Sequence, residues 1–256
     1  MSNLSDDQII AEYLDFVNRC RAELKHAVNV AHEKHRPSSE EGKAVYTWCV
    51  GLGALCHDIA GACADLIKAR HYRASQILER CLFEYSIRLQ YYRLEEAKAL
   101  EAVTALAPAL RRLFEHEDHL DPDHASALSA ADREDLAKWM ETVEGKPGRE
   151  VFFEMMKRVN PEQGEAVYRA VYGRGSAFVH GDVLSIMDLI GADFEGDPET
   201  HIRWQTKWSD PPRQLRWLTR SILWTLRSVE KITDRGSSFE RLDAEFEALN
   251  KRLGFK

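Results

Sequence analysis

The residue types that could support chemistry gather in one short stretch, residues 172–182. This stretch contains a permanently charged guanidinium, Arg174, and a titratable imidazole, His180, with five residues between them. Histidine exchanges protons near neutral pH, and arginine stabilises negative charge that develops on phosphate oxygens. The pair therefore suits general acid–base cleavage of a phosphodiester, in which His180 moves the proton and Arg174 stabilises the phosphate.

Three further polar residues accompany this pair. Ser176 lies four residues before His180, so the two side chains share a face if the stretch is helical. A serine beside a histidine can also act as a nucleophile and its base, although no G-x-S-x-G elbow surrounds Ser176. We assign Tyr172, Ser176 and Asp182 as supporting polar residues. The alternative is structural, with His180 hydrogen-bonded inside a helical core.

A second unusual feature is the charged pair Arg80 and Glu84, which lies inside a strongly apolar segment. Residues four apart are neighbours on one helix face. Charges in a core helix are costly unless they are paired. The pair is therefore either an internal structural link or part of a polar site, and the sequence leaves both readings open.

Together these motifs carry a family resemblance. Arg80-x-x-x-Glu84 is followed about ninety residues later by Tyr172-x-x-x-Ser176-x-x-x-His180-Gly. This arrangement resembles a bacterial family of helical domains of unknown function, which is in turn similar to the wider HEPN group of helical bundles. The resemblance extends over residues 45–230, approximately.

The resemblance implies an activity. HEPN ribonucleases are metal-independent, have an Arg and a following His with four to six residues between them, and dimerise so that two motifs face one RNA backbone. By this likeness Arg174 would hold the phosphate while His180 assists attack by the ribose 2′-hydroxyl, which restricts cleavage to RNA. A toxin or antiviral defence role and a homodimer are also implied. Gly175 departs from the active pattern, which usually has a polar residue there, so a non-catalytic relative is an alternative.

Charge and composition limit how RNA could bind. The 256-residue chain has a formal net charge of −7, so it is not a generally basic nucleic-acid coat. RNA would need a local basic path, because phosphate binding depends on clustered cations rather than net charge. Candidate residues for that path are Arg169, Arg174, Arg203, Lys207, Arg213, Arg216 and Arg220.

Metal and cofactor chemistry has little support in the sequence. Three cysteines lie seven residues apart, about 10 Å along a helix axis, which is too far for two of them to bind one zinc ion. They are Cys49, Cys56 and Cys63, and we expect buried, reduced thiols. Three histidines lie in an acidic loop without a familiar ligand spacing; they are His116, His119 and His124. No nucleotide-binding fingerprint is present, so no cofactor is expected.

The elements that must position these residues are helices. Apolar periodicity, caps and breakers predict helices over 5–35, 43–67, 72–94, 96–116, 130–143, 152–158, from 161 onward, 213–233 and 239–253. A strand-like alternation predicts a small β-hairpin excursion over 191–212, ended by two prolines. We therefore expect an all-α fold of about seven to nine helices. It would form one domain over 1–256, with the N- and C-terminal helices packed on a core over residues 45–230.

Cellular location and partners are also expectations at this point. No signal peptide is recognisable, and no apolar run approaches the roughly 18 residues of a membrane span. The sequence thus predicts a cytoplasmic protein without membrane contact. A competing hypothesis is a non-catalytic interaction module, in which the Trp-rich stretch 204–217 binds a protein partner such as an antitoxin.

Overall fold

The computed structural model describes residues 5–104, 152–168, 211–233 and 238–255, and the remaining residues lie outside this description. The described part contains eight helices and no strand, so the predicted all-α fold is confirmed. Their bounds are α1 Asp6–Lys34, α2 Glu40–Lys68, α3 Tyr72–Leu94, α4 Glu96–Thr104, α7 Phe152–Val159, α8 Gly164–Val167, α11 Pro211–Ile232 and α12 Ser238–Arg252.

The first two helices begin where polar side chains cap them. Ser5 forms a capping box with Gln8, whose backbone N–H donates to the Ser5 hydroxyl while the Ser5 N–H donates to the Gln8 side chain. The hydroxyl of Ser39 accepts from the backbone N–H of Gly42 at 3.0 Å. Between the two helices, Pro37 interrupts the chain as predicted.

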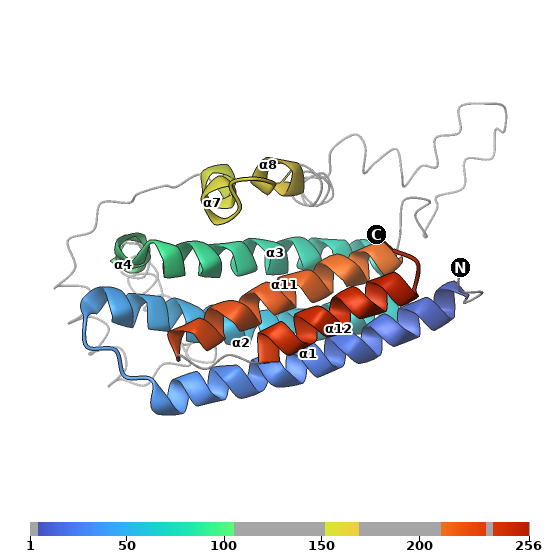
Figure 1. The fold of residues 1–256 in the computed structure, drawn as a ribbon, viewed down its shortest axis with the longest axis horizontal. Coiled ribbons are helices and arrows are strands. Elements are labelled where there is room, and N and C mark those ends of the chain that lie inside the picture. The colour runs from blue at the N-terminus through green and yellow to red at the C-terminus, as the bar shows by residue number, and fades with distance from the viewer. Residues whose placement is uncertain (1–4, 105–151, 169–210, 234–237, 256) are drawn as a thin grey trace, which may run out of the picture.

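The four longest helices in the described part, α1, α2, α3 and α11, pack together as a bundle. Figure 1 shows their arrangement. Helices α1, α3 and α11 run in the same direction, and α2 runs against them. Helix α11 packs against α1, α2 and α3, and α12 covers the side formed by α1 and α11. Helix α7 lies on α3 and carries α8, while α4 packs on α2 and α3. Helix α3 is therefore covered from several directions.

The inner face of α2 is lined with small residues, as its sequence predicts. Cys49, Cys56 and Cys63 are buried and unpaired, and burial raises the pKa of the first two thiols to about 12. Gly53 and Gly61 allow neighbouring helices to approach. A Cβ atom at Gly61 would lie 2.4 Å from the guanidinium of Arg21 on α1. These small residues let the neighbouring helices pack closely on α2, which lies in the centre of the bundle.

Helix α2 bears on the expectation that the chain has no membrane-spanning segment. Within the described residues, it is the one helix long and apolar enough to cross a membrane, judged by length and composition only. The core helix of a soluble protein passes the same test, so this property is weak evidence for a membrane span. The inner face of α2 is buried against its neighbours in the bundle.

Several boundary predictions need correction or fall outside the described residues. Pro211 and Pro212 were predicted to end an extended stretch, but they are the first residues of α11. Proline is tolerated there because the backbone N–H groups of a helix's first turn have no hydrogen-bond partner within the helix. The side chain of Asn160 accepts from the Gln163 N–H at 3.1 Å, but the helix beyond it, α8, spans only four residues before the description ends at residue 168. Residues 191–210 of the predicted hairpin and the predicted helix 130–143 lie outside the described residues.

Candidate functional site

The predicted site residues divide into two groups. Arg80 and Glu84 lie on α3 within the described chain. The predicted catalytic residues and their neighbours lie outside the described residues; they are Tyr172, Arg174, Ser176, His180 and Asp182. Of the predicted site, the structure therefore describes Arg80 and Glu84.

Arg80 and Glu84 form the expected pair. The Nε atom of Arg80 donates to Oε1 of Glu84 at 3.0 Å, and the two side chains are 10% and 20% exposed. A largely buried guanidinium loses its hydrogen bonds to water. The hydrogen bond and opposite charge of the carboxylate replace them. The predicted contact is confirmed, and the pair lies in a mostly dry environment.

Replacing Arg80 with alanine should destabilise the fold by about 2 kcal/mol, because Glu84 would keep a poorly hydrated charge without this partner. Urea unfolding of the two proteins measures the difference. The matched control is Lys43→Ala, which removes an exposed pair with Glu40 and should cost less than about 0.5 kcal/mol. Equal losses of unfolding free energy in both variants would show that the Arg80–Glu84 pair contributes no more to stability than an exposed pair.

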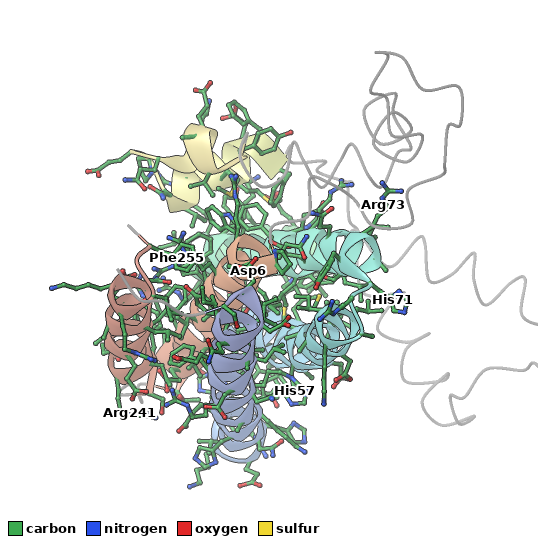
Figure 2. The ribbon with its side chains drawn as sticks, turned by 90° about the vertical axis from the view of Figure 1, so that its right-hand side faces the viewer. Asp6, His57, His71, Arg73, Arg241 and Phe255 are labelled. Atoms are coloured by element: carbon green, nitrogen blue, oxygen red, sulfur yellow. The ribbon has the colours of Figure 1, made fainter. Side chains whose placement is uncertain are left out.

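One face of α3 carries polar side chains that are partly or largely buried, which we call the α3 polar row. Its members recur at helical spacing on one face; they are Arg73, Gln76, Arg80, Glu84 and Arg88. Figure 2 shows Arg73 projecting from the outer side of α3 near its start. The row combines three guanidinium groups with one carboxylate.

In the described structure, Oε1 of Gln76 and Nε of Arg88 in the α3 polar row are buried without a hydrogen-bond partner. Buried polar atoms are usually satisfied, and unsatisfied ones often indicate a bound group or water. Arginine is well suited to phosphate because its planar fork donates several hydrogen bonds at once. The Arg88 guanidinium is therefore a candidate donor to an anion, whereas Oε1 of Gln76 is an acceptor and would require a donor instead.

The predicted basic path along α11 is only partly available. Arg220 donates to Asp243 at 2.6 Å and also pairs with Glu247, both on α12, and its guanidinium stands over the Phe246 ring. The Arg216 guanidinium lies 4.9 Å from the centre of the Phe255 ring. Arg220 thus links α11 to α12, and its guanidinium is engaged by two carboxylates. The path residues at 169, 174, 203 and 207 lie outside the described residues.

Sequence reasoning missed a cluster of polar groups inside the bundle, which we call the seam cluster. Its members come from α2, α3 and α11; they are Cys63, Ser75, Glu79 and Gln214. The Ser75 hydroxyl donates to Oε1 of Gln214 at 3.4 Å, and the Cys63 thiol donates to the Ser75 carbonyl oxygen at 3.7 Å. The cluster links three helices near the start of α3.

Glu79 is the titratable group of the seam cluster. Burial raises its pKa to about 8, and the positive charge of Arg213 lowers it in part. Its carboxyl group is therefore largely protonated at neutral pH. The sequence contains one signal for this group, which is the position of Glu79. It is a charged residue directly before Arg80 in the same apolar helix.

No metal site is visible in the described part of the chain, where no group of three or more His, Cys, Asp or Glu side chains could hold an ion. His116, His119 and His124 lie outside the described residues. The cysteines of α2 are separate, buried thiols.

Comparison of the chain with protein-family models, with curated proteins and with solved structures gave no match.

Proposed function

We propose that this protein is a HEPN-like, metal-independent endoribonuclease that acts in defence or as a toxin, with Arg174 and His180 as its catalytic residues. The observation that supports the proposal is the α3 polar row, which gathers guanidinium groups on one helix of an acidic protein. Clustered arginines provide the local affinity for phosphate that net charge does not. The all-α bundle agrees with the fold that the family resemblance implies.

In this proposal cleavage uses the RNA's own nucleophile. The 2′-hydroxyl attacks the adjacent phosphorus, a bond from O2′ to phosphorus forms, and the bond from phosphorus to the 5′-oxygen breaks. His180 moves the protons between the attacking and leaving oxygens, and Arg174 stabilises the charge on the phosphate. The products are a 2′,3′-cyclic phosphate and a free 5′-hydroxyl. DNA lacks the nucleophile and remains intact.

The test is an RNA cleavage assay in EDTA. Wild-type protein should cut labelled RNA, leave DNA of the same sequence uncut, and lose activity as Arg174→Ala or His180→Ala. Matched controls are Arg241→Ala and His57→Ala. Figure 2 places Arg241 on the other side of the bundle from Arg73, and His57 lies on α2. Activity that survives both catalytic-site substitutions, or requires a metal ion, would contradict the proposal.

The α3 polar row is tested with RNA binding in the same experiment. In a His180→Ala background, Arg88→Ala should weaken RNA binding and make it less dependent on salt, because one phosphate contact is removed. Arg241→Ala should leave both quantities unchanged.

The burial of the Arg80–Glu84 pair favours a second candidate, a helical protein-interaction module in which the pair is purely structural. A folded wild-type protein that neither binds nor cleaves RNA would favour this module over the nuclease.

A further inference from the structure

The seam cluster places a carboxyl group where it is almost fully shielded from water. Glu79 is 8% exposed and Gln214 is 5% exposed, while Ser75 and Cys63 are essentially buried. The surrounding helices are part of the bundle core, and α3 and α11 run side by side here. A carboxylate in such a place is unfavourable unless donors solvate it.

Hydrogen bonding within the seam does not stabilise a charged Glu79. In the described structure no hydrogen bond to its carboxyl group is present, and Nε2 of Gln214 has no acceptor. The nearby hydroxyl of Ser75 is already directed at Gln214. The cluster therefore holds one unused donor and one carboxyl group that can change its charge.

Among the described residues, two titratable groups interact electrostatically with Glu79. Arg213, at the start of α11, is the cation whose field reaches it, and Cys63 of α2 is the facing thiol. Arg80, its neighbour on α3, is paired with Glu84. On the other helices packed on α3, Glu154 pairs with Lys157, Arg158 with Glu95, and Lys98 with Glu101.

We propose that Glu79 is a proton-controlled lock between α3 and α11. In the neutral form the side chain fits the dry seam, and the starts of the two helices stay closely packed. In the ionised form the carboxylate requires donors, so it attracts Arg213, the free N–H of Gln214 and water into the seam. The first turns of α11 then loosen from α3. This lock is independent of RNA cleavage and goes beyond the proposed function.

The direction in which stability changes with pH follows from the raised pKa of Glu79. Its pKa is raised from 4.5 in the unfolded chain to about 8 in the fold. The folded protein therefore holds a proton that the unfolded chain releases, and its stability decreases as pH rises from about 4.5 to about 8. Above that window both states are ionised and this contribution is constant.

The experiment compares wild type with Glu79→Gln, which has a similar shape but no titratable proton. Urea unfolding between pH 5 and 9 should show that the unfolding constant of the wild type increases by up to about tenfold per pH unit within the window relative to the variant. Hydrogen exchange at the first turns of α11 should increase with pH in the wild type beyond the intrinsic rate. The matched control is Glu41→Gln, an exposed acid on α2 that should keep the wild-type slope.

Carbon-detected NMR of the wild-type carboxyl groups provides a direct measurement even if Glu79→Gln fails to fold. A Glu79 pKa well above 4.5 supports the lock. Titration near 4.5, or the same pH slope in wild type and Glu79→Gln, overturns it. None of these measurements involves RNA, so the result is separate from the outcome of the cleavage assay.

Discussion

Replacing Phe83 with alanine is expected to destabilise the protein by about 3–5 kcal/mol, the usual loss for a buried phenylalanine. Phe83 is completely buried on α3 and meets the Phe152 ring edge-on at 6.0 Å between centroids. The Trp224 ring lies at 6.2 Å on the other side. One side chain thus joins α3 to both α7 and α11. Its removal leaves a cavity at that junction, which urea unfolding would measure.

The control for Phe83 is Leu55→Ala on α2. Leu55 is 41% exposed, so its truncation removes little buried surface and should cost less than about 1 kcal/mol. A loss at Phe83 no larger than the loss at Leu55 would mean that α7 is not anchored through this ring. Limited proteolysis should also release the α7 region of Phe83→Ala before it cuts the bundle.

The second large effect is expected for Gly53→Val. A Cβ atom at Gly53 would lie 2.9 Å from Cγ2 of Val28 on α1 and 3.1 Å from Cγ2 of Val229 on α11. Both neighbours are branched side chains with little freedom to move. Valine adds two further methyl groups to this contact, so we expect a loss of about 3 kcal/mol in unfolding free energy.

Gly51 provides an unusually close comparison for Gly53. It lies two residues earlier on α2, and a Cβ atom there would meet nothing within 4 Å. Gly51→Ala should therefore stabilise the helix by up to about 1 kcal/mol, since alanine restricts the unfolded chain more than glycine does. Thermal unfolding of both variants tests the pair. Opposite shifts are expected, and a similar rise in both variants would indicate that helix propensity rather than packing controls stability at Gly53.

Local patterns in the sequence predicted much of the helical architecture. The periodicity over 72–94 agrees with α3, Tyr72–Leu94. The prediction that Cys49, Cys56 and Cys63 are buried was also correct, because small residues seven apart share one helix face. Helix α2 begins three residues earlier than predicted, since the Ser39 cap draws its first turn back to Glu40.

Features that depend on distant segments were not predictable in the same way. On α3 the apolar residues Ile77 and Leu78 are only partly buried, whereas the polar residues Ser75 and Glu79 are inside. The reason is that α2, α11 and α7 cover α3 from several sides, which a single-helix pattern cannot show. The acidic partners of Arg220 likewise come from α12. For the catalytic assignment of Arg174 and His180, the sequence remains the basis.

The order of the helices has a consequence for synthesis of the chain. Helix α1 packs mainly against α11, and Tyr13 and Phe16 meet Asn250 and Phe246 of α12. Translation proceeds at about 5–20 residues per second, so α1 is made before α11 and α12 exist. The apolar side of α1 lacks these partners while the residues between them are synthesised, and in that interval the nascent chain can bind chaperones or aggregate. Closure of the bundle thus waits for helices that lie far along the chain from α1.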